Sequence, residues 1–185
     1  PSTLNLVGSW LLRLGARRPG LQNVDVEVQM PSSLFQEKDV LNGRYFHKRA
    51  FYLAVLAEAL APTFNVEYVD IYGDRRRLGL VIRPTPGTDT DFSSSKTAIL
   101  IHLAHENGIF GGRLSPSRNN LRASHVGGEH DEPTPVYNTA IVSDSLRLGH
   151  FVFLHGTAQE CPAFADAVML LKTWATQRGF GTILC

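Results

Sequence analysis

Apolar and polar residues alternate along residues 23–30, which is the pattern of a half-buried β-strand. Side chains two positions apart in a strand share a face, so the apolar residues at positions 24 to 30 face one way and Asp25 and Glu27 the other. Later segments predict three further strands, at residues 65–72, 78–83 and 97–103. In the first of these three, Glu67 and Asp70 are expected on a solvated face.

Helical spacing appears before and between these strands. Residues 6–14 have the pattern of a short helix that ends at Gly15. A long helix is expected from residue 33 to residue 60, because Ser33 and Gln36 have the spacing of a capping box. Apolar residues at helical spacing predict its buried face, namely Leu41, Tyr45, Tyr52 and Leu56.

The helical period returns toward the C-terminal end, at residues 139–157 and 163–178, with Pro162 at a first helical turn. Residues 124–135, which precede these helices, combine acids and histidines with glycines and prolines, a composition typical of a linker. We therefore place a domain boundary near residue 135 and expect one domain at residues 1–135 and the opening of a second at residues 136–185.

With 185 residues, 43% of them hydrophobic, the chain has the length of one domain or slightly more. No apolar run approaches the ~20 residues of a membrane-spanning helix, so we expect no membrane partner. Cys161 and Cys185 form neither a disulfide framework nor zinc spacing, as in a reducing compartment. Because the chain begins at Pro1 and stops within an apolar stretch, we interpret it as a piece of a longer protein.

The net charge of +1 indicates no particular partner, but the basic residues occur in local clusters. Such clusters engage the phosphates of a nucleic acid even when the total charge is near zero. The competing interpretation is that each basic residue forms an ion pair on the surface or between domains. The residues that we predict to contact RNA are Arg44, Lys48, Arg75, Arg76, Arg77, Arg113, Arg118 and Arg122.

Gly8 and Ser9, followed by Asp25 and Glu27, have the order of residues that opens a nucleotidyltransferase site. Two carboxylates on one strand face suit Mg²⁺, which takes one or two carboxylates together with substrate phosphates. A Gly-Ser turn at a helix start would offer backbone N–H groups to a triphosphate. The competing interpretation is that Asp25 and Glu27 are the polar side of an ordinary amphipathic strand, and the pattern alone favours it.

The further carboxylate that two-metal phosphoryl transfer needs is missing from the later apolar strands. Neither residues 78–82 nor residues 98–101 contain an acid. His102 and His105 lack the spacing and the additional ligands of a zinc site, so we interpret them as ordinary strand histidines. The sequence thus predicts no occupied metal site, no cofactor and no catalytic residue.

Several phrases along the chain resemble the nucleolar RNA-associated protein (Nrap) family. They occur in the order of that family from about residue 24 to residue 180, which is nearly the whole chain. The phrases are MPSSLFQEKD at residues 30–39, LNGRYFHKRAFYLA at 41–54, LSPSRNNLR at 114–122, TPVYN at 134–138, CPAFADA at 161–167, LLKTW at 170–174 and QRGF at 177–180.

The resemblance implies an α+β fold similar to that of archaeal-type CCA-adding enzymes. Residues 1–135 would be the first nucleotidyltransferase-like domain of the family, a mixed sheet with flanking helices. Residues 136–185 would be the truncated start of a helical domain like that of poly(A) polymerase and oligoadenylate synthetase. Gly8, Ser9, Asp25 and Glu27 would then be relics of the ancestral nucleotide and metal site.

The resemblance also implies a non-catalytic scaffold subunit of the small-subunit processome in the nucleus and nucleolus. Its partners would be pre-rRNA or small nucleolar RNA and other processome proteins. Two alternatives stay open: an active Mg-dependent RNA nucleotidyltransferase that uses Asp25 and Glu27, and a site that binds a nucleotide or an RNA end without turning it over.

Overall fold

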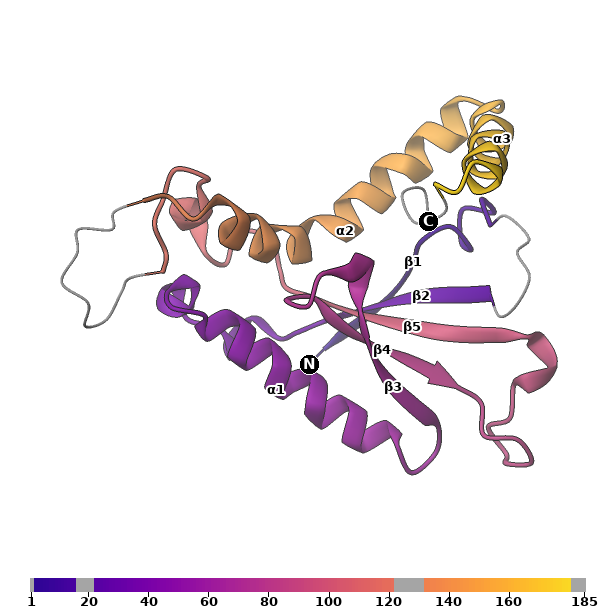
Figure 1. Cartoon of the computed structure of the whole chain (residues 1–185), viewed down its shortest axis with the longest axis horizontal. Coiled ribbons are helices and arrows are strands. Elements are labelled where there is room, and N and C mark those ends of the chain that lie inside the picture. Colours follow the sequence, from indigo (N-terminus) through magenta and orange to yellow (C-terminus); the bar gives the residue numbers. More distant parts are fainter. Residues whose placement is uncertain (1, 16–21, 122–131, 181–185) are drawn as a thin grey trace.

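Within residues 2–15, 22–121 and 132–180, which the computed structural model describes, the centre of the fold is a five-stranded mixed sheet (Figure 1). Its strands lie in the order β1-β2-β5-β4-β3. Strands β2 and β5 are parallel, and the other neighbours are antiparallel. The strands are β1 (Thr3–Val7), β2 (Gln22–Gln29), β3 (Asn65–Asp70), β4 (Leu78–Arg83) and β5 (Thr97–Ala104).

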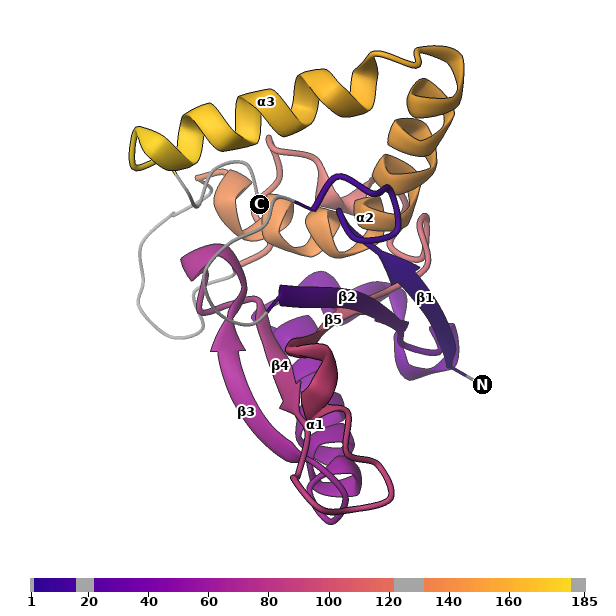
Figure 2. The same ribbon diagram turned by 90° about the vertical axis from the view of Figure 1, so that its right-hand side faces the viewer.

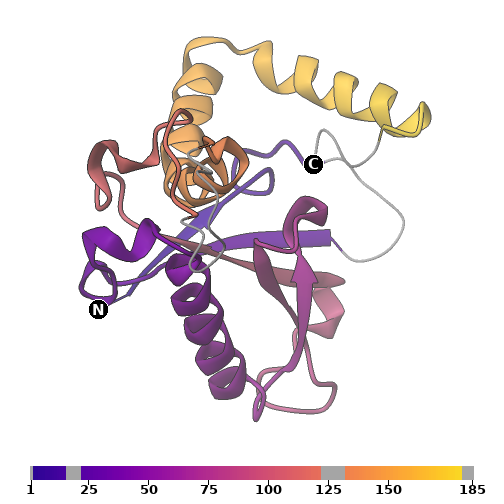
Figure 3. The same cartoon turned by 60° about the vertical axis from the view of Figure 1, so that its left-hand side comes forward.

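The helices lie on both sides of this sheet (Figures 2 and 3). Helix α1 (Arg44–Leu60) packs on one side, whereas α2 (Pro135–Glu160) and α3 (Phe164–Gln177) lie on the other. None of the helices in the described residues is long and apolar enough to cross a membrane. The strands predicted after residue 60 and the two C-terminal helices are confirmed within a few residues. Glu67 and Asp70 are exposed, as predicted.

The helix predicted at residues 6–14 is wrong. Residues Thr3–Val7 form β1, which pairs antiparallel with β2, and the chain then makes a turn closed by a hydrogen bond from Leu14 N to Ser9 O (2.8 Å). Arg13 in this turn has a φ of 57°, which an α-helix does not allow. Pairing with β2 satisfies the backbone of this short segment, and its few apolar residues did not distinguish a strand from a helix.

The long helix is shorter than predicted, because it begins at Arg44 and not at residue 33. Asn42 (φ 53°) and Gly43 (φ 78°) both adopt left-handed backbone conformations, which interrupt a right-handed helix. Two 3-10 helices, η1 (Ser32–Leu34) and η2 (Glu37–Val40), precede this break. The predicted Ser33–Gln36 capping box is also wrong, since Gln36 N donates instead to Asp39 Oδ2 (2.7 Å).

The buried face of α1 is rotated from the predicted one. Tyr45 is buried as expected, but Tyr52 and Leu56 are only half-buried. Four residues at i, i+4 spacing make up the fully buried face: Tyr45, Arg49, Leu53 and Ala57. The sequence pattern missed this face because one of its members, Arg49, is charged.

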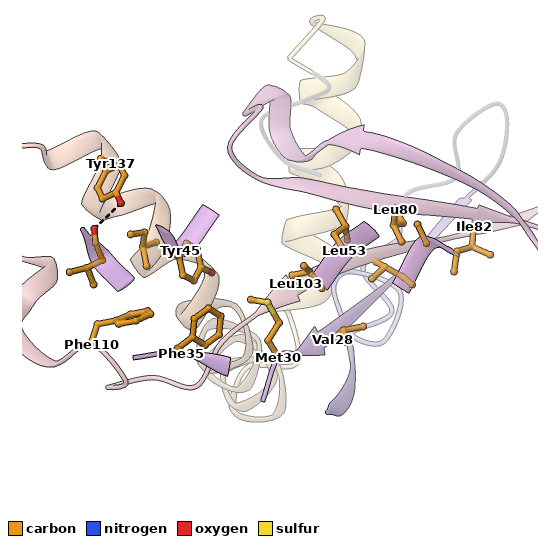
Figure 4. Packing of buried hydrophobic residues seen from close by; sticks show 14 residues of the cluster. Val28, Met30, Phe35, Tyr45, Leu53, Leu80, Ile82, Leu103, Phe110 and Tyr137 are labelled. Carbon is orange, nitrogen blue, oxygen red and sulfur yellow. Dashed lines mark hydrogen bonds between the residues drawn. The ribbon is translucent and has the colours of Figure 1, made fainter. Parts of the chain in front are cut away.

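The core lies between α1 and the sheet and continues under the start of α2 (Figure 4). Its strand residues include Val28, Leu80 and Leu103, all 3% exposed or less. Tyr137 and Ile141 bring the first half of α2 into the same cluster, and Tyr137 donates its hydroxyl to Val40 O (2.7 Å). This half of α2 therefore packs with the sheet. The division of the chain near residue 135 stays a prediction.

Gly79 allows β4 to pack closely against its surroundings. A Cβ at this position would lie 2.5 Å from Ile101 O and 2.7 Å from Ile71 Cδ1. Because Ile101 O belongs to the backbone of β5, it cannot move without disturbing the sheet. We expect Gly79→Ala to lower the free energy of unfolding by about 1–3 kcal/mol, measured by urea denaturation.

Gly156 provides the matched control, because it lies inside α2 and an added Cβ would have no atom within 4 Å beyond its chain neighbours and the nearby backbone of its own helix. Gly156→Ala is expected to raise the free energy of unfolding by up to about 1 kcal/mol through helix propensity. Equal effects of the two substitutions would contradict the packing argument for Gly79.

Candidate functional site

Gly8 follows β1 directly and lies against Asp25 of β2. Val7, the last residue of β1, pairs with Asp25, so the turn that begins at Gly8 passes over this carboxylate. A Cβ at Gly8 would lie 2.5 Å from Asp25 Oδ2 and 3.0 Å from Asp25 Cβ. With its φ of 82°, this position requires glycine both for its conformation and for the close approach. The structure thus brings Gly8 and Asp25 together.

The turn after Gly8 and Ser9 differs from the one predicted for a triphosphate site. Residues 8–13 form turns, and no helix begins there within the described residues 2–15. Ser9 O is occupied by the hydrogen bond from Leu14 N. A helix N-terminus with several free N–H groups, which is the feature that binds phosphate, is therefore missing at this turn.

Asp25 and Glu27, which we call the acid pair, lie on the same face of β2 but in different surroundings. The side chain of Asp25 is partly exposed and that of Glu27 is buried. Glu27 Oε1 accepts a long hydrogen bond from Asn5 Nδ2 (3.5 Å). Glu27 Oε2 has no hydrogen-bond partner among the described residues. Burial raises the pKa of Glu27, and nearby Arg147 of α2 lowers it in part.

His102 stands opposite the acid pair on the neighbouring strand. Strands β2 and β5 are parallel, and their register pairs Glu27 with His102. Paired residues share a face of the sheet, so a third carboxylate from β5 would belong at this position. The structure has an imidazole there instead, and His102 Nε2 lies 2.8 Å from Asp25 Oδ1.

The contact makes His102 a donor to the carboxylate of Asp25. Burial lowers the pKa of His102, its hydrogen bond to Asp25 raises the pKa in part, and the charges of Arg147 and Arg77 lower it further. The imidazole is therefore neutral at pH 7 and donates its Nε2–H. We interpreted His102 as an ordinary strand histidine, and this was incomplete. The signal in the sequence was a polar residue inside the apolar run of residues 98–104, but its partner became visible only with the register of β5 on β2.

A second charged group lies next to the acid pair. Asp144 of α2 is 1% exposed, and its Oδ2 accepts hydrogen bonds from Arg49 Nε (2.8 Å) and Tyr45 Oη (2.7 Å). Arg77 Nε lies 3.4 Å from Asp144 Oδ1. Asp144 also contributes to the raised pKa of Glu27, so the two groups are close enough to interact.

These residues do not fit a two-metal phosphoryl-transfer site. Mg²⁺ requires oxygen ligands, whereas the position of a third carboxylate holds an imidazole that already binds Asp25. The charge of Arg147 near Glu27 opposes a divalent cation at the same carboxylate. No group of three or more His, Cys, Asp or Glu side chains suited to a metal ion occurs in the described part of the chain.

Half of the residues predicted to contact RNA form ion pairs within the chain. Lys48 Nζ lies 2.7 Å from Asp39 Oδ2, and Arg77 is directed to Asp144. Arg76 pairs with Asp74 (2.8 Å) and Arg113 with Glu37 (3.1 Å). Arg44, Arg75 and Arg118 are exposed, and Arg122 lies outside the described residues.

The exposed Arg44 and Arg118 flank one contact between two loops. Asn42 N donates to Asn120 O (2.8 Å), and each arginine lies two residues from one end of this hydrogen bond. Asn120 is held in turn by Arg113 O and by Asn138 Oδ1 of α2, both at 2.8 Å. The buried side-chain amides of Asn120 and Asn138 thus help to hold together two segments that carry exposed arginines. These segments are far apart in the sequence, so the sequence did not suggest that they meet.

A mixed sheet with flanking helices and a Gly-Ser turn over an acid-bearing strand is consistent with a nucleotidyltransferase-like fold. The family described as Nrap protein domain 1 matches residues 1–160. The chain therefore belongs to the Nrap family.

Named relatives extend this assignment. The chain is 38% identical over 185 residues to Nucleolar protein 6 of Mus musculus and 36% identical over 187 residues to that of Xenopus tropicalis. It is 31% identical over 195 residues to U3 small nucleolar RNA-associated protein 22 of Saccharomyces cerevisiae. These alignments cover 96 to 97% of the chain and 16% of each relative, so the chain spans about one sixth of their length.

Because Gly8 lies against Asp25, we expect a side chain at position 8 to lower the free energy of unfolding. Gly8→Ala is expected to lose about 1–2 kcal/mol of unfolding free energy through its positive φ. We expect a further loss of about 1–2 kcal/mol, because the new methyl group displaces Asp25 from His102. Urea denaturation of the purified variant measures both losses together.

Gly87 separates the two contributions, since its φ is 79° and no atom lies within 4 Å of an added Cβ. Gly87→Ala should show the conformational loss alone. The excess loss of Gly8→Ala should also become smaller in an Asp25→Ala background, which removes the carboxylate oxygen 2.5 Å from the new methyl group. Equal losses for Gly8→Ala and Gly87→Ala would show that the contact has no energetic importance.

Proposed function

We propose that this chain is the first, nucleotidyltransferase-like part of a non-catalytic scaffold in the nucleolus, which acts in pre-rRNA processing and small-subunit biogenesis. Its partners in this proposal are pre-rRNA or small nucleolar RNA and other proteins of the small-subunit processome. The names of the relatives, Nucleolar protein 6 and U3 small nucleolar RNA-associated protein 22, support the location and the RNA. Residues 136–185 would begin a helical domain that continues in the longer protein.

The observation that carries the non-catalytic part is the hydrogen bond between His102 and Asp25 (2.8 Å). Two-metal phosphoryl transfer needs carboxylates that hold two cations about 3.5–4 Å apart. In this chain one acid binds an imidazole, the other lies near an arginine, and the neighbouring strand supplies no third acid. Gly8, Ser9, Asp25 and Glu27 then persist as relics of a nucleotide and metal site, and no cofactor is required.

RNA contact is proposed for Arg44, Arg75 and Arg118, which expose their side chains to solvent. Arg122 remains a candidate from the sequence alone. Contacts from arginine to phosphate give affinity that falls with salt and depends weakly on sequence. Lys48, Arg76, Arg77 and Arg113 are weaker candidates, because an RNA phosphate would compete with the carboxylate that each one already pairs with.

Charge reversal tests the RNA contact. We expect Arg44→Glu/Arg118→Glu to weaken binding to a U3 small nucleolar RNA fragment, measured by fluorescence anisotropy over a range of salt concentrations. If each arginine contacts one phosphate of a single strand, the slope of log K against log salt should become shallower by about 1.4. Unchanged affinity and slope would exclude this pair of residues as an RNA contact.

Lys96→Glu is the control, because it also replaces one positive side chain with a negative one. Lys96 is exposed and directly precedes β5, so it belongs to neither of the segments that meet at the Asn42–Asn120 contact. It should leave the affinity within about twofold, since a distant surface charge is largely screened at physiological salt.

The alternative function, Mg-dependent nucleotidyl transfer, has a direct test. The protein is incubated with RNA, Mg²⁺ and labelled ATP or CTP, and wild type is compared with Asp25→Ala. We expect no transfer by either protein. Transfer by wild type that Asp25→Ala abolishes would overturn the non-catalytic proposal. Calorimetry with ATP or CTP and Mg²⁺ on the same two proteins tests whether the site binds a nucleotide without turning it over.

A further inference from the structure

A buried amide of α2 fixes the loop that carries the exposed Arg118. Asn138 is 0% exposed, and its Nδ2 donates to Ser115 O (2.7 Å) and to Arg118 O (3.0 Å). Its Oδ1 accepts a hydrogen bond from Asn120 Nδ2 (2.8 Å). One side chain therefore holds the backbone of residues 115–120, which form neither a helix nor a strand.

The residue just before α2 adds to this attachment. The backbone N and the Oγ1 of Thr134 both donate to Arg118 O, at 3.0 Å and 3.2 Å. The same Oγ1 accepts from Asn120 N (3.0 Å). The backbone at Arg118 is therefore held from the side of α2, whereas the side chain of Arg118 is exposed to solvent.

Tyr137 fixes the loop that leads to Arg44. Its hydroxyl donates to Val40 O (2.7 Å) and accepts from Gly43 N (2.8 Å). Gly43 comes directly before Arg44, the first residue of α1, and its left-handed φ of 78° sets where the helix begins. Tyr137 is only 8% exposed, so water competes little for its hydroxyl. Consecutive residues of α2 thus hold the two loops that carry the exposed arginines.

We propose that Tyr137 and Asn138 are positioning residues for the RNA contact, because they hold Arg44 and Arg118 in one relative arrangement before RNA binds. This inference rests on the proposed RNA contact and adds the device that prepares it. Both positioning residues are buried, so neither contacts RNA itself. The two arginines form a rigid pair for two phosphates of one RNA backbone, in contrast to a flexible basic tail.

Preorganisation has a measurable consequence for binding. A loop that is ordered only when it binds pays conformational entropy at that step, and this cost reduces the affinity. In this chain the packing of α2 on the sheet has already ordered both loops. Loss of the hydrogen bonds of Tyr137 or Asn138 transfers the cost to the binding step. The affinity then falls, although the number of arginine–phosphate contacts stays the same.

Hydrogen exchange detected by NMR tests the positioning without RNA. Tyr137→Phe removes only the hydroxyl, and Asn138→Ala removes the amide. We expect the backbone amide of Asn42 in Tyr137→Phe to exchange at least about tenfold faster than in wild type. The backbone amides of Arg118 and Asn120 should show the same increase in Asn138→Ala.

The amides of β5 should keep their wild-type exchange rates, which also establishes that each variant is folded. Unchanged exchange in a folded variant would overturn the positioning role of the residue that was replaced. Tyr137→Phe keeps the ring that packs against Phe46, with ring centroids 5.4 Å apart. It therefore tests the proposal even if Asn138→Ala does not fold.

RNA affinity is the second readout, measured with the U3 small nucleolar RNA fragment and the salt series of the charge-reversal experiment. We expect each variant to bind about three- to tenfold more weakly than wild type, with an unchanged slope of log K against log salt. The unchanged slope distinguishes a positioning residue from an arginine that contacts phosphate, because the slope counts the phosphates that are neutralised.

Gly79→Ala is the control for a general loss of stability. The atoms that its new methyl group would meet belong to Ile101 and Ile71, which lie in neither loop. It should leave the RNA affinity within about twofold of wild type, as expected for sites without shared partners. An affinity loss as large as that of the two positioning variants would overturn the inference, because destabilisation alone would explain it.

The outcomes separate this inference from the proposed function. Wild-type affinity in both positioning variants, together with weaker binding by Arg44→Glu/Arg118→Glu, would overturn the positioning role and leave the RNA contact standing. If the charge-reversed protein binds RNA as wild type does, the proposed RNA contact fails, and this inference fails with it.

Discussion

The buried carboxylate of Asp144 is the constraint on which the arrangement of the elements depends. It accepts hydrogen bonds from Tyr45 and Arg49 of α1 and lies close to Arg77. Arg49 continues the connection by donating to Leu78 O at the start of β4 (2.7 Å). The backbone carbonyl of Asp144 accepts from His105 N just after β5 (3.3 Å). One residue thus links both long helices to the end of the sheet.

An aromatic group surrounds this link and keeps it from water. The rings of Phe35 and Tyr45 stack with centroids 5.4 Å apart, and Phe110 and His105 meet Tyr45 edge-on. Burial, together with the neighbouring charge of Asp144, raises the pKa of Tyr45 well above its usual value, so its hydroxyl stays protonated and can donate. Exclusion of water strengthens each polar contact, and it also makes any unpaired group costly. The polar link and the apolar core therefore depend on each other.

The acid pair on the sheet also has partners from inside the chain. In a catalytic domain that face needs a surplus of negative charge to hold cations. Here His102 donates a hydrogen bond to Asp25, and the nearby charge of Arg147 lowers the pKa of Glu27 in part. The RNA surface proposed above is therefore limited to residues that the internal network leaves exposed. Arg44 and Arg118 meet that condition at the Asn42–Asn120 contact.

The sequence by itself determined the strands after residue 22, the two C-terminal helices and the family, because alternation, helical spacing and ordered phrases are local properties. It also grouped Gly8 and Asp25 in one candidate site, and the structure places these two residues in contact. Local pattern failed at residues 6–14, where pairing with β2 extends a strand to Val7 and a turn follows it. It failed again at the start of α1, where the left-handed Asn42 and Gly43 fixed the first turn.

Only the tertiary structure decided the role of the charged residues. Arg49 and Asp144 are 95 positions apart, and His102 and Asp25 are 77 apart, so no spacing rule connects them. Arg77 looked like part of an exposed basic cluster, yet the fold turns it toward a buried acid. A charge is stable inside a protein only when a partner arrives from elsewhere in the chain. Burial and pairing of charge are therefore long-range properties, which the periodicity of the sequence does not record.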